Sequence, residues 1–235
     1  MGKRVKQLRT AAFLLGMAVF FAQSPVARSH DSKPMKRILV FGDSLSEGFG
    51  LSSNRAYPAL LTTKLRTESL DFEITNASQS GGTTDDGIQR LPRHLKRKID
   101  IFILELGIND AFRGVPIAQI QHNLQEIIDR VKRNNPDVRI IICGMQLPNY
   151  TADDYVFAFG RMYSDLATKN NAALVPYLLQ GVGGDPSLNQ TDGIHPNAAG
   201  QRILAENVWH VLEPIAREVA SVSSRAQARD LTKGR

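Results

Sequence analysis

The chain has 235 residues, enough for one α/β domain of ordinary size with a substantial core. Its formal net charge is +6, but residues 1–29 carry five basic and no acidic side chains, and residues 221–235 carry four basic and one acidic. Removing those ends leaves a charge of about −2, so the sequence gives no electrostatic argument for nucleic-acid binding.

The first segment of the chain has the pattern of a secretory signal peptide. Four basic residues among the first nine precede an apolar stretch of twelve residues, Ala11 to Ala22. Ala27 and Ser29 provide small side chains at the −3 and −1 positions of a cleavage point. Because the apolar stretch is short for a membrane span, we predict that residues 1–29 are removed. The mature protein would then be periplasmic or secreted, without a stable membrane anchor. An uncleaved N-terminal anchor is the alternative.

Strand-like and helix-like segments alternate through the rest of the chain. Apolar runs predict strands at 37–41, 72–76, 100–106, 138–143 and 173–177. Helical spacing of apolar residues predicts helices at 58–70, 85–98, 116–134, 152–170 and 197–219. Apolar strands that alternate with amphipathic helices are typical of a parallel sheet covered on both faces. We therefore predict an α/β fold, a three-layer α/β/α sandwich with a parallel five-stranded sheet.

One domain is predicted over residues 30–220, because neither a repeat nor a linker interrupts this alternation. Residues 221–235 are basic and lack an apolar period, which predicts a disordered tail. Cys143 is the only cysteine, so an intramolecular disulfide and a thiolate metal cluster are excluded. It ends a predicted strand, which favours a buried core thiol over a nucleophile.

Four polar islands lie at the ends of predicted strands or the starts of predicted helices. They are Gly42–Leu45, Ser80–Thr83, Gly107–Asp110 and Asp192–His195. Gly42 breaks the first strand, and Ser44 lies on the turn that follows, where its hydroxyl can reach solvent. Ligands of open parallel sheets bind beyond the carboxyl ends of the strands, so the islands are expected to converge on one crevice.

Together the islands contain the groups needed for acyl transfer through a serine. Ser44 is the candidate nucleophile, His195 the general base, and Asp192 the residue that orients the imidazole. The backbone N–H groups of Ser44 and Gly81 and the side chain of Asn109 are candidate oxyanion donors. Each residue also has a simpler interpretation as a turn or capping residue when it is considered alone.

The four islands resemble the conserved blocks of the GDSL-type, or SGNH, hydrolases. The resemblance extends over 37–215, and its blocks are Val40–Ser46, Asn76–Ser78, Leu104–Gly107, Asn109–Asp110, Arg113–Gly114 and Asp192–Asn197. Within the superfamily, the chain is similar to the acyl-CoA thioesterase I, lysophospholipase L1 and arylesterase group of secreted bacterial esterases. The resemblance implies a flavodoxin-like SGNH hydrolase fold. It also implies a triad of Ser44, Asp192 and His195, with an oxyanion hole of Ser44, Gly81 and Asn109.

The resemblance further implies that Leu147, Asn149 and Tyr150 line the substrate site. Two departures from the relatives affect this region. Ile108 stands where a second glycine is frequent, which predicts a narrower floor of the site. The segment 149–155 differs from the longer loop of the relatives, so their acyl preference is not transferred to this chain.

These features predict a secreted serine esterase that hydrolyses carboxylic esters, and with them thioesters or lysophospholipids, through an acyl-enzyme. The alternatives are a carbohydrate O-acetylesterase or acetyltransferase on the same fold, and a non-catalytic binding module. The side chains expected near the mouth favour apolar acyl chains slightly over sugars: Leu147, Tyr150, Phe157, Phe159 and Val182. The expected partner is a small acyl ester or a lipid, and the expected oligomeric state is a monomer.

No cofactor is predicted. The sequence contains no H-E-x-x-H, C-x-x-C, P-loop or complete G-x-G-x-x-G motif, so neither a metal nor a nucleotide is indicated. Three acidic residues lie in or beside the islands, and none is assigned a catalytic role. Asp43 and Asp110 are expected to brace the loops through hydrogen bonds to backbone, while Glu105 receives no assignment.

Overall fold

A computed structural model describes residues 35–148 and 154–233 of the chain, with side chains described as far as residue 222. The predicted signal peptide, residues 1–29, lies outside the described residues. The same is true of Asn149 and Tyr150, two of the three predicted substrate-lining residues.

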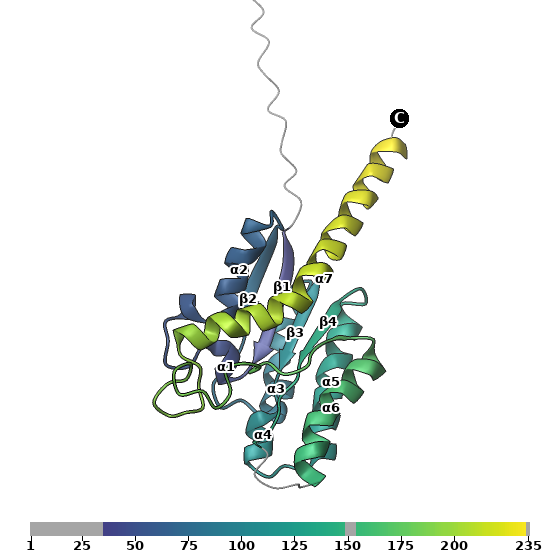
Figure 1. The fold of residues 1–235 in the computed structure, drawn as a ribbon. Coiled ribbons are helices and arrows are strands. Elements are labelled where there is room, and N and C mark those ends of the chain that lie inside the picture. Colours follow the sequence, from purple (N-terminus) through teal and green to yellow (C-terminus); the bar gives the residue numbers. More distant parts are fainter. Residues whose placement is uncertain (1–34, 149–153, 234–235) are drawn as a thin grey trace, which may run out of the picture. The chain divides into compact units, whose positions relative to one another are not determined.

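Five parallel strands form one sheet, as the sequence predicts (Figure 1). They are β1 (Lys36–Gly42), β2 (Phe72–Asn76), β3 (Ile101–Glu105), β4 (Arg139–Cys143) and β5 (Ala173–Val175). Their order is β2-β1-β3-β4-β5, and every neighbouring pair is parallel. The chain moves to one side of β1 to form β2 and to the other side to form β3. The order therefore reverses between β1 and β3, the place where doubly wound folds bind their ligands.

The central strands are buried on both faces, which their apolar sequences require. Every residue of β3 is buried, and so is β1 from Arg37 to Gly42. Cys143 is fully buried at the end of β4, which confirms its prediction as a core thiol. Strands of this kind are stable in water only when helices cover both faces of the sheet.

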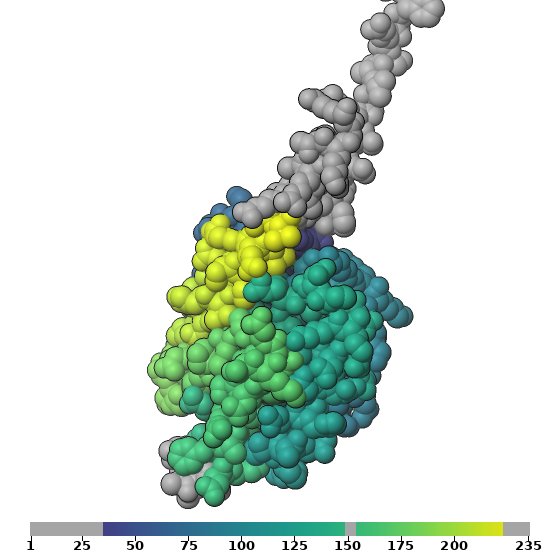
Figure 2. Space-filling view, turned by 90° about the vertical axis from the view of Figure 1, so that its right-hand side faces the viewer, coloured from purple at the N-terminus to yellow at the C-terminus, as the bar shows by residue number. Residues whose placement is uncertain are grey.

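The helices provide that cover. They are α1 (Ser44–Glu47), α2 (Tyr57–Thr67), α3 (Thr84–Arg90), α4 (Ile108–Phe112), α5 (Ile117–Asn134), α6 (Asp154–Asn170) and α7 (Ala198–Lys233), with 3-10 turns η1 (Ser53–Arg55) and η2 (Leu91–His94). Helices α2 and α7 pack together over one face, while α3 packs on α5 and α5 on α6 over the other (Figure 1). Figure 2 views the side on which α6, in green, lies beside α5, in teal. The predicted three-layer arrangement is confirmed.

The structure differs from the predicted elements in two places. The predicted helix at 85–98 is α3 followed by η2, because Pro92 cannot continue an α-helix. The predicted disordered tail is helical in its backbone as far as Lys233. Residues 215–232 contain neither glycine nor proline, and they include four alanine and three arginine residues, which favour helix.

Across 35–148 and 154–233, none of the helices combines the length and the apolar character that a bilayer crossing would need.

Candidate active site

Ser44 occupies the first position of α1, directly after the turn that ends β1. Asp43 caps this helix, since its Oδ1 accepts a hydrogen bond of 3.0 Å from the Leu45 N–H. Gly42 is required at the turn, because a Cβ there would lie 2.5 Å from Glu105 Oε2 and 2.5 Å from Ser46 Oγ. The turn thereby presents the Ser44 hydroxyl at the carboxyl end of the sheet.

Asp192 and His195 lie on a tight turn before α7. Asp192 Oδ1 accepts hydrogen bonds from the N–H groups of Ile194, at 2.9 Å, and His195, at 3.0 Å. Gly193 takes a positive φ of 71° within this turn, a conformation that glycine adopts at little cost. The carboxylate therefore orders the turn that carries the imidazole.

The structure brings Ser44, His195 and Asp192 together in a hydrogen-bonded series. His195 Nε2 lies 3.0 Å from Ser44 Oγ, and His195 Nδ1 lies 2.8 Å from Asp192 Oδ2. The backbone N–H groups of His195 and Ile194, together with the imidazole, lower the pKa of Asp192 to about 2. An ionised Asp192 holds the proton on Nδ1, which leaves Nε2 able to accept the serine proton. The ring of Phe49 packs against the imidazole, with centroids 4.6 Å apart.

Two of the predicted oxyanion donors face the same pocket as the serine hydroxyl. The Ser44 N–H belongs to the first turn of α1, so it has no acceptor within that helix. Asn109, on α4, contributes to the pocket wall together with Ser44. Its Nδ2 donates to Asp43 Oδ2 at 3.0 Å and to the Gly82 carbonyl at 3.1 Å. These two bonds fix the direction of the amide.

Gly81 lies in a turn with a positive φ, outside the residues that line the pocket. A Cβ at this residue would meet nothing within 4 Å, so crowding does not require glycine here. Its φ of +72° favours glycine, because residues that carry a Cβ are strained in that backbone conformation. Arg113 Nη2 holds the Gly81 carbonyl at 3.1 Å. Gly81 is not among the residues that line the pocket, and its role as a donor stays a prediction.

The acidic residues of the islands brace the loops, as expected. Asp110 accepts hydrogen bonds from Thr84 N at 2.9 Å and from Thr84 Oγ1 at 2.6 Å, which joins α4 to the start of α3. Asp43 caps α1 and holds Asn109. No sequence motif predicts that Glu105 is buried beside Asp43, because that contact depends on the alignment of β1 with β3.

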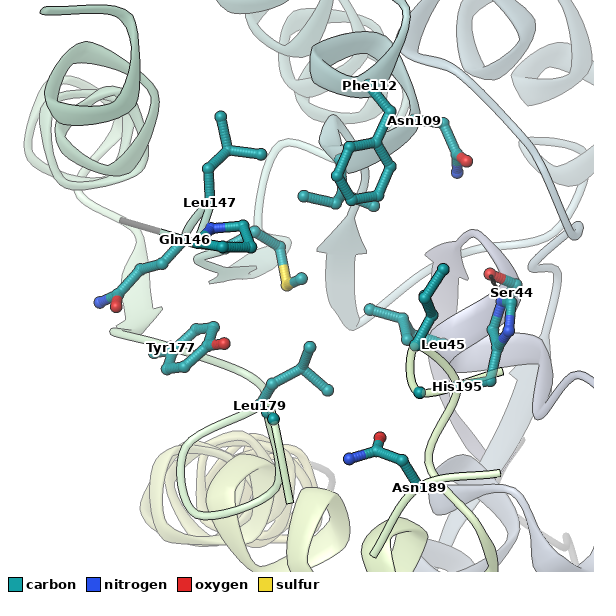
Figure 3. Close-up of a pocket in the computed structure, with 17 residues that line it drawn as sticks. Ser44, Leu45, Asn109, Phe112, Gln146, Leu147, Tyr177, Leu179, Asn189 and His195 are labelled. Carbon is teal, nitrogen blue, oxygen red and sulfur yellow. Dashed lines mark hydrogen bonds between the residues drawn. The ribbon is translucent and has the colours of Figure 1, made fainter. Parts of the chain in front are cut away.

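An elongated, largely apolar pocket of about 540 Å³ begins at Ser44 and His195 (Figure 3). Its apolar lining consists of Leu45, Ile108, Phe112, Met145, Leu147, Pro148, Leu179 and Ile194. In Figure 3, Ser44 and His195 lie at one end, and Leu147, Gln146 and Tyr177 lie at the other. The predicted lining residue Leu147 and the predicted floor residue Ile108 both contribute to the wall.

Three apolar residues expected near the mouth are located elsewhere. Phe159 and Val182 are fully buried in the core, and the Phe159 ring packs edge-on against Tyr163. Phe157 is exposed on α6 and does not line the pocket. Met145 and Tyr177, which follow β4 and β5, line the pocket but were not predicted from the sequence. The rule that parallel strands end at one edge of the sheet indicates this region but not the individual side chains.

The described residues also include no cluster of three or more His, Cys, Asp or Glu side chains arranged to hold a metal ion.

Comparison with known proteins places the chain among ester hydrolases. A model of the GDSL-like Lipase/Acylhydrolase family matches residues 40–203. Over 179 residues, the chain is 40% identical to Esterase TesA of Pseudomonas aeruginosa, covering 76% of this chain and 88% of that protein. It is 35% identical over 179 residues to thioesterase 1/protease 1/lysophospholipase L1 of Escherichia coli K12, covering 76% and 84%. The crystal structure of TesA superimposes with a TM-score of 0.73 at 40% identity, over 77% of this chain and 99% of that one.

Proposed function

Since the chain belongs to the GDSL-like lipase/acylhydrolase family and is an ester hydrolase, we propose that it is exported and cleaves acyl esters through a covalent intermediate on Ser44. The observation that carries this proposal is the contact between Ser44 Oγ and His195 Nε2, 3.0 Å long, at the end of an apolar pocket. The apolar pocket suits an acyl chain. Ser44 lines the end of the pocket at which the carbonyl carbon of that chain would bind.

The proposed reaction has two halves. In the first, Ser44 Oγ attacks the carbonyl carbon while His195 Nε2 takes the hydroxyl proton. The C–O bond to the leaving group then breaks, and His195 returns the proton to the departing alkoxide. In the second half, His195 deprotonates a water molecule that attacks the acyl-enzyme, and the carboxylic acid leaves as Ser44 recovers its proton.

Charge that develops on the carbonyl oxygen would be stabilised by the donors around Ser44. We assign this role to the Ser44 N–H, the Gly81 N–H and the Asn109 side chain. An oxyanion is a stronger acceptor than a neutral carbonyl, so it would compete with the Gly82 carbonyl for the Asn109 amide. Asp192 would keep the imidazole in the required tautomer and stabilise its cationic form.

A fluorophosphonate probe tests the nucleophile. We expect one covalent label on the wild-type protein and none on Ser44→Ala, measured by intact mass spectrometry. Ser52→Ala is the matched control, because Ser52 is exposed and its hydroxyl donates only to Asn54 among the described residues. A label that persists in Ser44→Ala would refute the assignment of the nucleophile.

The substrate class follows from the same pocket. We propose acyl esters and lipid-derived esters as substrates, hydrolysed by a monomer without a nucleic-acid partner. On p-nitrophenyl esters from C2 to C16, the optimum should lie beyond acetate. Leu179→Trp should lower kcat/KM for the long esters more than for acetate, because Leu179 lines the pocket away from Ser44. Hydrolysis confined to acetate would favour the carbohydrate acetylesterase alternative.

Localisation is a separate part of the proposal, carried by the basic and apolar pattern of residues 1–29. Intact-mass analysis of the protein from the periplasm or medium should find an N-terminus near His30. A full-length species held in the membrane fraction would support the N-terminal anchor instead.

A further inference from the structure

Two carboxyl groups lie buried side by side beneath the nucleophile, and the proposed reaction uses neither of them. Asp43 and Glu105 both have side chains with no exposure to solvent. The sheet itself brings them together, because the register of β1 on β3 pairs Gly42 with Glu105. Two ionised carboxylates in a dry interior repel each other and lose their hydration, so one of the two is expected to keep a proton.

The hydrogen bonds around the pair distinguish its four oxygen atoms. Asp43 Oδ1 accepts from Leu45 N at 3.0 Å, and Asp43 Oδ2 accepts from Asn109 Nδ2 at 3.0 Å. Glu105 Oε2 accepts from Asp43 N at 3.1 Å and from Ser46 Oγ at 2.7 Å. Among the described residues, no donor reaches Glu105 Oε1, although this atom is buried. Both oxygens of Asp43 are thus supplied with donors, whereas one oxygen of Glu105 is not.

The strand register and the hydrogen bond from Asp43 N to Glu105 Oε2 place the two carboxyl groups side by side, and each changes the pKa of the other. A hydrogen bond between two carboxyl groups needs a proton on one of them, since an ionised carboxylate can only accept. A proton on Glu105 Oε1 gives that unpartnered atom a hydrogen to donate, whereas a proton on Asp43 would weaken, as an acceptor, an oxygen that already receives a hydrogen bond.

We propose that Glu105 is a neutral carboxylic acid that donates a hydrogen bond to the Asp43 carboxylate, and that it is thereby a positioning residue for the oxyanion donor Asn109. The inference rests on the proposed function, because Asn109 needs positioning only if an oxyanion forms there. The series runs from Glu105 to Asp43 and from Asp43 to the Asn109 amide. It allows a side chain on β3 to fix an amide on α4 without touching the substrate.

The charge of the buried cluster supports one proton on the pair. Arg90 is buried beside it, with its Nη2 donating to the Gly42 carbonyl at 2.7 Å and its guanidinium 3.8 Å from the Phe41 ring centre. Arg90 also faces the Asp86 carboxylate, so this single cation does not compensate two further ionised carboxylates. Burial raises the pKa of Glu105 well above its usual range and raises that of Asp43 to about 6, so Asp43 is the partner that ionises near neutral pH.

Four other ionisable groups face the pair: Tyr57 from α2, Cys143 from β4, Tyr163 from α6, and His195, which acts on Asp43 through its charge. Burial raises the pKa of Tyr57, Cys143 and Tyr163 well above their usual values, so these three stay neutral.

Replacement of Glu105 by glutamine and by leucine tests the positioning role. In Glu105→Gln, the amide oxygen can accept from Asp43 N and Ser46 Oγ, and the amide N–H can donate to Asp43 as the protonated acid does. We expect kcat within roughly threefold of wild type and an unchanged pH profile of kcat/KM. Glu105→Leu removes the donor, so kcat should fall roughly 10- to 100-fold with little change in KM.

Infrared spectroscopy tests the proton without any substrate. The difference spectrum of wild type minus Glu105→Gln at pH 7 should contain the carbonyl stretch of a buried, protonated carboxyl group. Glu73→Gln is the matched control: Glu73 is on β2, and its hydrogen bonds to Arg97 lower its pKa, so its difference spectrum should show no such band. If Glu105→Leu fails to fold, the infrared difference spectrum tests the proton on Glu105, and the activity of Glu105→Gln tests its positioning role.

Three results would overturn the proposal: the absence of that band, a loss in Glu105→Gln as large as in Glu105→Leu, or full kcat in a folded Glu105→Leu. If wild type shows the band but hydrolyses no ester, the protonated carboxyl group would be supported and the proposed function would be refuted. The two failures are therefore distinguishable.

Discussion

At the scale of single residues, Asn109 is the side chain whose proposed work can be measured most directly. Its amide is held by Asp43 and by the Gly82 carbonyl, and we propose that it donates to the oxyanion. Asn109→Ala should lower kcat by roughly 10²–10³, a loss of about 2.7–4 kcal/mol of transition-state stabilisation. KM should change little, because the donor acts on charge that develops during the reaction.

The control for this variant is Asn207→Ala. Asn207 also donates its amide to two carbonyls, those of Leu178 and Gln180, but it does not line the pocket. It should leave kcat unchanged. A loss smaller than tenfold in Asn109→Ala would mean that Asn109 only braces the loop.

Asp192 orders the turn that carries His195, and the chemical role that we propose for it can be tested with one variant. Asp192→Asn keeps the size of the side chain but no longer stabilises the imidazolium, and it weakens the preference for the Nδ1–H tautomer. By comparison with other triads, kcat should fall by as much as about 10⁴. Steady-state kinetics on one activated ester measures the effect. Retention of most activity would indicate that Ser44 and His195 act as a dyad.

The structural role of Asp192 should depend on pH. Its pKa is lowered in the folded protein from 3.8 to about 2, so its ionised form stabilises the fold. That contribution is complete above the unfolded pKa and is lost as pH falls towards 2. Wild type should therefore be slightly more stable than Asp192→Asn at pH 7 but not at pH 2. The difference in unfolding free energy will be small, because the side chain is 38% exposed. A difference that grows on acidification would contradict this account.

Contacts between residues that are close in the sequence can be predicted better than contacts that depend on how separate strands and helices pack. Asp192 and His195 are three positions apart, and their contact follows from one tight turn. Glu105 contacts Asp43, and Arg90 contacts Gly42, only because separate elements pack together in one register. No local sequence motif predicts that register. Phe159 was expected near the mouth and is in the core, because the irregular pattern of its helix does not show which side faces inward.

At the scale of elements, length decides what can be predicted. The five strands and the long helix α5 were predicted within a few residues, since each carries a clear apolar run or a helical period. Helices α1 and α4 were missed because four or five residues contain too little of a period to recognise. These two short helices carry Ser44 and Asn109, so the local geometry of the site was the least predictable part.

The start of α3 offers a test of element stability. Thr83 caps this helix, accepting from Asp86 N, while the Asp86 side chain accepts from Thr83 N. Thr83→Ala should reduce the free energy of unfolding by about 0.5–2 kcal/mol, measured by urea denaturation. Thr83→Ser keeps the capping oxygen and is the matched control. Equal losses in the two variants would show that the methyl group, and not the cap, stabilises the helix.

At the scale of the whole molecule, one buried amide ties the last helix to the nucleophile turn. Gln201, on α7, accepts from Tyr57 N at 2.8 Å and donates to the Leu45 carbonyl at 3.1 Å. Gln201→Met fills a similar volume but leaves both backbone groups unpaired, at roughly 1–3 kcal/mol each. Thermal and urea unfolding should show the loss, and kcat should fall as α1 loosens.

Arg202→Met is the control for this change, because Arg202 is the exposed neighbour of Gln201 on the same helix. It should leave stability within about 0.5 kcal/mol of wild type. If Gln201→Met and Arg202→Met behave alike, the buried amide contributes nothing specific to the junction between α7 and α1.

The separation of Ser44 and His195 also governs when the enzyme becomes active. The two residues lie 151 positions apart in the chain. Synthesis at roughly 5–20 residues per second delivers the serine about 8–30 s before the histidine. Throughout that interval the nascent chain carries a hydroxyl with no base beside it. Under the proposed mechanism, a newly made molecule cannot attack esters in the compartment of its synthesis until the chain extends beyond His195, and a ribosome that stalls before this residue releases a fragment without the base.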